Sequence, residues 1–421
     1  MLEQNESMLP PLTQGKTTRV VTVGFEQDST EELHRLLKTL GVEAVYDLHV
    51  NQKQISAATY IGKGKVEELL NHVKQHEADA VIVDTELSPN QVRNIEKIIG
   101  KVILDRPGVI IEIFSQHARS KEAKTQVELA RLQYLLPRLT GLWTHFERQR
   151  GGGATSRGMG EKQIEVDKRL LKDRMNRLKS KLKEIKKERG VRRSNRAEVL
   201  QVAFVGYTNA GKSTLLNALT HSNVIVENKL FSTLDSYVRA LDPHSHPPMV
   251  AIDTVGFIKK LPPSLIASFR STLEELQEAD LLVHVVDASS ITAQEELETT
   301  VEILTELELE KKPRLVVLNK MDLVKSPSEL NWVKMVAKGS QRVSALKPED
   351  VKVLRDTISK FFIKNLKLFE VLIPYSESKV EAQIHEYGVV ESKKFLDKGT
   401  FFRVRMETSW AEKLGLKKYQ P

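Results

Sequence analysis

The chain has 421 residues, more than one hydrophobic core usually organises, so we expect about two to four domains. It contains no cysteine, which excludes disulfides, thiol nucleophiles and zinc–thiolate sites. No run approaches the ~20 apolar residues of a membrane span, and the amino terminus lacks the basic and apolar regions of a signal peptide. We therefore expect a cytoplasmic protein, in which the placement of the formal charge of +8 bears on nucleic-acid binding.

Residues 1–117 predict an amino-terminal α/β domain. Strand-like apolar runs alternate there with helical segments, which is typical of a parallel sheet. Ser88 followed by Pro89 is typical of a helix cap and the first helical position. The expected strands span residues 19–23, 42–50, 80–84 and 102–105.

Residues 118–197 predict a helical hairpin. Apolar residues recur at helical spacing from 118 to 136, and a later series has the alternating three and four spacing of a coiled-coil seam. Residues 161–198 hold fifteen Lys or Arg against seven Asp or Glu, which favours either a solvated exterior or a nucleic-acid-binding face. The seam series is Ile164, Leu171, Met175, Leu178, Leu182 and Ile185.

The loop between these two helices is rich in arginine, glycine and aromatic residues. Glycines let a backbone approach phosphates closely, while guanidinium groups and rings stack on unpaired RNA bases. We take Arg148, Arg150 and Arg157 as candidate RNA contacts, with a plain linker as the alternative.

Residues 198–365 predict a nucleotide-binding domain that begins with a phosphate-binding loop. An apolar strand at 201–205 precedes the pattern G-x-x-x-x-G-K-S and a helical segment follows it, which is the context that this pattern requires. Backbone N–H groups would wrap the phosphates, Lys212 would reach the β and γ phosphates, and the Ser213 hydroxyl would bind Mg²⁺. The predicted contacts are Gly206, Tyr207, Thr208, Asn209, Ala210, Gly211, Lys212, Ser213 and Thr214.

Two further segments predict contacts to Mg²⁺ and to the γ phosphate. The strand at 249–252 ends at Asp253, Thr254, Val255 and Gly256, where the Asp253 carboxylate suits the Mg²⁺ shell and the Gly256 N–H can bond the phosphate. Before it, Thr233 is a candidate switch residue closing on Mg²⁺ and the γ phosphate, and an ordinary loop threonine is the alternative. We assign catalytic contacts to Lys212, Thr233 and Gly256. The predicted switch contacts are Phe231, Ser232, Thr233, Leu234 and Asp235.

A third group of residues is expected to select the base. The Asp322 carboxylate can accept hydrogen bonds from the N1–H and exocyclic amine of guanine, whereas adenine would present an acceptor to it. Asn319 would tie the base to the phosphate loop, and the stem of Lys320 would cover the ring. The motifs predict an enzyme that binds GTP and GDP and hydrolyses GTP, and they argue against an ATPase or kinase. The predicted contacts are Asn319, Lys320, Met321, Asp322, Ser344, Ala345 and Leu346.

The order of these elements resembles the HflX family of translation-factor-related GTPases. The resemblance continues in YIGKGK at 60–65, LDRPG at 104–108 and TQVELARL at 125–132. It implies binding of the large ribosomal subunit and ribosomal RNA near the peptidyl transferase centre, and the splitting or rescue of ribosomes. The arginine- and glycine-rich loop between the two predicted helices departs from the family, because Met159 stands where the family usually has proline.

Several interpretations stay open beside this one. A GTP-dependent RNA-modification or RNA-remodelling factor is the alternative function. Asn209 is either a K⁺ ligand beside the phosphates or a loop-stabilising residue, and residues 62–65 are either a second phosphate site or a basic turn. Residues 366–421 predict a small carboxy-terminal α/β appendage of unassigned role. We expect a monomer that binds no DNA.

Overall fold

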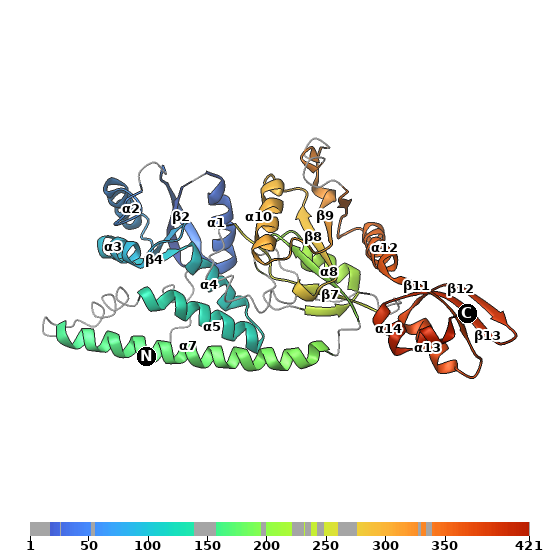
Figure 1. Cartoon of the computed structure of the whole chain (residues 1–421). Helices are drawn as coiled ribbons and strands as arrows, with labels where there is room; N and C mark the ends of the chain where they lie inside the picture. The colour runs from blue at the N-terminus through green and yellow to red at the C-terminus, as the bar shows by residue number, and fades with distance from the viewer. Residues whose placement is uncertain are drawn as a thin grey trace. The chain divides into compact units, whose positions relative to one another are not determined.

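The chain forms two compact units in the computed structural model (Figure 1). The first takes the described residues up to 187 together with Phe231, and the second takes the others. The structure describes residues 17–25, 27–51, 55–138, 157–194, 199–220, 231, 237–241, 248–259, 276–326, 330–333 and 339–420.

The first unit contains a parallel four-stranded sheet in the order β2-β1-β3-β4. Its strands are β1 (Arg19–Gly24), β2 (Glu43–His49), β3 (Ala80–Val83) and β4 (Val102–Asp105). This sheet confirms the four predicted strands. The helices are α1 (Gln27–Leu40), α2 (Lys63–Gln75), α3 (Pro89–Ile99) and α4 (Arg106–His117).

Helix α3 begins as its sequence predicts. The Ser88 hydroxyl accepts a hydrogen bond from the Gln91 N–H at 3.3 Å, and the Gln91 side chain accepts one from the Ser88 N–H at 2.9 Å. This reciprocal pair is a capping box, with Pro89 at the first helical position. Gly100 ends the helix with φ 76°, a conformation that glycine adopts without strain.

The sequence LDRPG joins strand β4 to helix α4 through two buried polar residues. Asp105 caps α4 by accepting from the Gly108 N–H at 3.1 Å, and it also accepts from the Tyr134 hydroxyl at 2.7 Å and from Arg138 at 3.0 Å. Arg106 is 1% exposed and donates to Asp84 at 2.6 Å. The motif is therefore a structural junction that fixes α4 against the following helix.

The predicted helical hairpin consists of α5 (Lys121–Leu135), the short η1 (Leu136–Arg138) and the long α7 (Arg157–Ser194). Leu171 and Leu178 are buried, which confirms the predicted seam at those two positions. Arg174 of α7 forms an ion pair with Glu128 of α5 at 2.8 Å. Arg148 and Arg150 lie outside the described residues, and the side chain of Arg157 also lies outside them.

The second unit contains a six-stranded sheet in the order β10-β9-β8-β5-β7-β6, in which only β6 pairs antiparallel. Its helices are α8 (Lys212–Thr220), α10 (Ala293–Glu306) and α12 (Pro348–Asn365), with the turn η2 (Met321–Leu323). The carboxyl ends of parallel strands meet at one edge of a sheet, which is where α/β proteins bind ligands. The strands are β5 (Leu200–Gly206), β6 (Tyr237–Ala240), β7 (Met249–Asp253), β8 (Leu281–Asp287), β9 (Arg314–Asn319) and β10 (Gln341–Arg342).

The end of the chain forms a separate three-stranded antiparallel sheet in the order β11-β13-β12 (Figure 1). Phe402, Val404 and Met406 alternate with polar residues along β13 and are fully buried. The elements are β11 (Lys367–Ile373), α13 (Ser378–Tyr387), β12 (Val389–Leu396), β13 (Gly399–Met406), α14 (Thr408–Lys413) and η4 (Leu416–Tyr419). The predicted α/β fold class is confirmed, whereas the domain boundaries at 117, 197 and 365 remain predictions.

Among the helices that the structure describes, none combines the length and apolar character needed to cross a membrane.

Candidate nucleotide-binding site

The loop after strand β5 has a backbone that only glycine permits at two positions. Gly206 has φ +147°, and a Cβ there would lie 2.1 Å from the Val285 carbonyl oxygen. Gly211 has φ +91°, and a Cβ there would lie 2.2 Å from the Asn319 side-chain nitrogen. The loop therefore passes close to the ends of strands β8 and β9, and its glycines are required by these close approaches.

Lys212, the first residue of α8, folds back over this loop. Its Nζ donates to the carbonyl oxygens of Gly206 at 3.0 Å and Tyr207 at 2.8 Å. Burial lowers the pKa of Lys212 to about 8, while the negative charges of Asp253 and Glu296 raise it. The ammonium is thus fixed beside the loop, where a phosphate group would be its natural counter-charge.

Ser213 and Asp253 bring two oxygen ligands together from α8 and β7. The Ser213 hydroxyl donates to the Asp253 carboxylate at 2.8 Å, and both side chains are buried. A hydroxyl and a carboxylate are the hard oxygen donors that Mg²⁺ prefers. The pair that the sequence singled out at 40 positions of separation is therefore adjacent in space and fits a magnesium site.

The segment after β7 runs beside the phosphate-binding loop. The Phe257 N–H donates to the Gly206 carbonyl at 3.1 Å, and the Thr208 N–H donates to the Phe257 carbonyl at 2.8 Å. The Phe257 ring is buried with Val205 and Ile252 in an apolar cluster. These contacts hold Gly256, the predicted γ-phosphate donor, directly beside the loop.

The predicted base-binding residues gather at the ends of β9 and β10. Asn319 donates to the Ala210 carbonyl at 2.9 Å and accepts from the Ala345 N–H at 3.1 Å. Its side chain therefore joins the phosphate loop to the segment that contains Ala345. The Ser344 hydroxyl donates to Asp322 at 2.6 Å, which orients that carboxylate. The Asn319 side chain thus forms hydrogen bonds with two residues that lie 109 and 26 positions away in the sequence.

Four other predicted contacts occupy different surroundings. Lys320 has φ 60° and pairs with Asp287, the last residue of β8, at 2.6 Å. Thr254 is buried, and its hydroxyl donates to the Phe204 carbonyl of strand β5 at 2.6 Å, inside the core. Asn209 is exposed, also with positive φ, and Leu346 is 76% exposed.

The predicted switch segment is described at one residue. Phe231 is buried, and its ring contacts that of Phe114 of α4 edge-to-face, with 4.7 Å between centroids. This contact lies within the first unit, to which Phe231 belongs. Ser232, Thr233, Leu234 and Asp235 lie outside the described residues.

Glu296 and Tyr207 have roles that the sequence motifs did not indicate. Glu296 of α10 is buried near Lys212 and accepts from the hydroxyls of Ser290 at 2.7 Å and Thr292 at 2.9 Å. The Tyr207 hydroxyl accepts from the Lys259 N–H at 2.8 Å. An acidic residue on the apolar face of a helix was the one available signal for Glu296.

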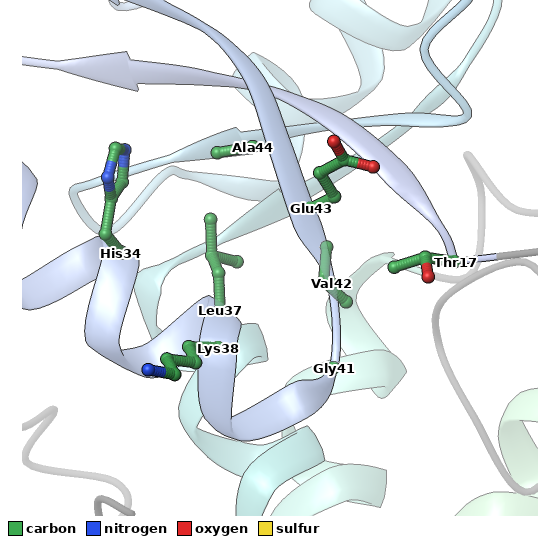
Figure 2. A pocket seen from close by; sticks show the side chains of 8 residues that line it. All are labelled: Thr17, His34, Leu37, Lys38, Gly41, Val42, Glu43 and Ala44. Carbon is green, nitrogen blue, oxygen red and sulfur yellow. The ribbon is translucent and has the colours of Figure 1, made fainter.

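A hollow of about 430 Å³ lies where α1 ends and β2 begins in the first unit, and Figure 2 shows the residues that line it. His34, one of the lining residues, pairs with Asp47 at 2.8 Å. None of the predicted nucleotide contacts lines this hollow. The lining residues are Thr17, His34, Leu37, Lys38, Gly41, Val42, Glu43 and Ala44.

The arrangement at the carboxyl ends of β5, β7 and β9 defines a P-loop GTPase. Known families match consecutive parts of the chain, described as "GTP-binding GTPase N-terminal" at residues 27–115, "GTP-binding GTPase Middle Region" at 117–196 and "50S ribosome-binding GTPase" at 201–320. A GTPase HflX from Caldanaerobacter subterraneus subsp. tengcongensis is 40% identical over 94% of this chain and 91% of its own. The chain belongs to the GTPase HflX family, and it is a GTP hydrolase.

A second relative agrees with this assignment. The GTPase HflX of Escherichia coli is 41% identical over 316 residues, which is 74% of either chain. A solved GTP-binding protein from the archaeon Sulfolobus solfataricus, in complex with GDP, is 28% identical over 82% of this chain and 98% of its own, with a TM-score of 0.44.

Proposed function

We propose that this GTPase binds the large ribosomal subunit in its GTP state and uses hydrolysis to split or rescue ribosomes. It acts in the cytoplasm as a monomer. Support comes from the family to which the chain belongs and from the family description "50S ribosome-binding GTPase" that fits its nucleotide domain. The observation that carries the proposal is the strongly basic exterior of helix α7.

Helix α7 exposes many cations outside its two buried seam positions, and one of them, Arg174, pairs with Glu128 of α5. The described side chains from 165 to 188 bury only Leu171 and Leu178 fully. Lysine and arginine at such density attract the phosphates of RNA, and their binding releases counterions. The exposed basic residues are Arg169, Lys172, Arg174, Arg177, Lys179, Lys181, Lys183, Lys186 and Lys187.

The nucleotide site supports a magnesium-dependent GTPase in particular. Ser213 and Asp253 would hold Mg²⁺, with Thr233 as the third predicted ligand from the switch segment. The ion would neutralise charge on the phosphates. Asp322 and Asn319 would bind guanine, and K⁺ beside Asn209 would add a further positive charge at the phosphates.

Catalysis is expected to depend on the ribosome. Many GTPases orient the attacking water with a glutamine directly after the glycine that binds the γ phosphate. In this chain that glycine is Gly256, and the buried Phe257 follows it. A phenyl ring can neither donate to water nor accept from it. An aligned water and a charge partner contribute several kcal/mol, so intrinsic turnover should be slow and a partner should raise it by orders of magnitude.

Sedimentation and phosphate release test the proposal together. We expect the protein to co-sediment with large subunits when bound to a non-hydrolysable GTP analogue and to dissociate with GDP. Large subunits should raise steady-state phosphate release at least about tenfold. Fast turnover by the protein alone, with no stimulation and no nucleotide-dependent co-sedimentation, would contradict the ribosomal role. Equal rates in KCl and NaCl at matched ionic strength would remove K⁺ from the site.

A further inference from the structure

The phosphate-binding loop contains a buried hydroxyl that its motif does not explain. Thr208 is 5% exposed, and its Oγ1 atom is buried without a hydrogen-bond partner among the residues that the structure describes. The loop motif depends on backbone N–H groups and assigns no role to the side chain at this position. Because burying an unsatisfied hydroxyl costs free energy, such a group in an otherwise well-bonded loop calls for a ligand.

The surroundings of Thr208 indicate which ligand that is. A Cβ added to Gly256 would lie 2.8 Å from both Cα and Cγ2 of Thr208, and 3.0 Å from Nζ of Lys212. Thr208, Gly256 and Lys212 therefore border one small volume. The Lys212 ammonium and the Gly256 N–H are the two donors expected at the γ phosphate of GTP.

The side chain is also held in place. The Thr208 N–H donates to the Phe257 carbonyl at 2.8 Å, so the backbone is fixed to the segment that contains Gly256. The methyl group packs against Gly256, and a β-branched side chain has few rotamers. The side chain is thereby held at the edge of the phosphate site, with its hydroxyl buried beside the methyl group.

We propose that the Thr208 hydroxyl donates a hydrogen bond to the γ-phosphoryl group of GTP. This hydrogen bond makes Thr208 a catalytic residue that also distinguishes GTP from GDP. The Thr208 hydroxyl supplies a polar contact to the γ-phosphoryl group, which the Phe257 ring cannot supply. Water attacks the γ phosphorus, the bond to the β–γ bridging oxygen breaks, and GDP and phosphate leave. Thr208 keeps its proton throughout. The proposal concerns the isolated enzyme and is independent of the ribosomal role.

Three variants test this role in the full-length protein. Thr208→Val keeps the shape and removes the hydroxyl, and Thr208→Ser keeps the hydroxyl. Thr305→Val is the matched control, because Thr305 lies on the outer part of α10 and its exposed hydroxyl bonds only its own helix, to the Val301 carbonyl at 2.9 Å. The measurements are the affinities for GDP and for a non-hydrolysable GTP analogue, and single-turnover hydrolysis of GTP.

We expect Thr208→Val to weaken analogue binding about tenfold while GDP affinity changes less than about twofold, because a hydrogen bond to a charged group is lost. Single-turnover hydrolysis should fall at least about tenfold. Thr208→Ser should recover most of both losses, and Thr305→Val should match the unmodified protein. If Thr208→Val preserves the ratio of analogue to GDP affinity, the proposal is wrong, whether binding of both is retained or both are lost together.

Discussion

Asp322 is the residue on which the choice of base depends. Its carboxylate is oriented by the Ser344 hydroxyl at 2.6 Å and stands beside the segment that Asn319 organises. The Asp322→Asn variant exchanges an acceptor for a donor, which suits xanthine rather than guanine. We expect GTP affinity to fall at least about 100-fold and xanthosine triphosphate affinity to rise. Competition binding measures both, and equal displacement by ATP and GTP from the unmodified protein would contradict the base assignment.

His284 determines part of the acid stability of the second unit. It is fully buried in strand β8, and burial lowers its pKa to about 3, with the positive charges of Arg314 and Lys212 acting in the same direction. Because the folded pKa lies below the ordinary value of 6.5, the neutral ring is favoured in the folded state. The associated stability is present above pH 6.5 and is lost as the pH falls towards 3.

The variant His284→Leu removes this titration. We expect its free energy of unfolding to fall less steeply than that of the unmodified protein between pH 6.5 and pH 4, by up to about 1.4 kcal/mol per pH unit. Urea unfolding at a series of pH values measures the slope. Parallel slopes for the two proteins would mean that His284 is protonated without opening the sheet.

At the scale of elements, Arg106 joins three parts of the first unit. It donates to Asp84 at the end of β3 and to Glu32 of α1, and it begins α4. Removing the cation with Arg106→Met leaves two carboxylates without it, one of them fully buried, and should destabilise this region by about 3–5 kcal/mol. Hydrogen exchange should show lost protection in β3 and α4.

A surface arginine provides the control for that prediction. Arg35 lies on α1 with 59% of its side chain exposed and approaches Glu31 at 3.8 Å. The Arg35→Met variant should change local stability by less than about 0.5 kcal/mol. Equal losses of protection in the two variants would show that the buried position of Arg106 contributes nothing specific.

Phe257 links the core of the second unit to the site, and we expect its ring to take no part in the chemistry. Its ring packs with Ala203, Val205 and Ile252, while its backbone pairs with the phosphate loop. Phe257→Leu keeps most of the apolar volume, so intrinsic single-turnover hydrolysis should stay within about threefold of the unmodified rate. A tenfold loss at unchanged GTP affinity would mean that the aromatic ring itself helps the reaction.

At the scale of the whole molecule, RNA binding is expected to depend on the loop between α5 and α7 and on Arg157, where α7 begins. Replacing Arg148, Arg150 and Arg157 with alanine should weaken co-sedimentation with ribosomes and reduce the slope of affinity against salt, because fewer counterions are released. GTP affinity should not change. The control replaces Lys398, Lys417 and Lys418, three exposed lysines of the carboxy-terminal sheet region, with alanine. Normal co-sedimentation of the arginine variant at moderate salt would leave the loop as a linker.

The sequence alone determined the fold class and the family, and it predicted which residues would contact the nucleotide. Each of these depends on consecutive residues, such as the strand, glycine loop and helix around Lys212 or the cap at Ser88. Local hydrogen bonds and backbone conformations are set by a few neighbouring side chains, and parallel strands bring their carboxyl ends to one edge. The adjacency of Ser213 and Asp253 followed from that rule.

Only the tertiary structure decided which polar groups are buried and what they contact. Arg106 meets Glu32 across 74 positions of sequence, and Phe231 contacts Phe114, without any local pattern that indicates either partner. Thr208 occupies a variable position of the phosphate loop, and no local pattern indicates that its hydroxyl is buried or that its methyl group packs against Gly256. Such contacts arise from side chains that pack between elements distant in the chain, and periodicity within one element carries no information about them.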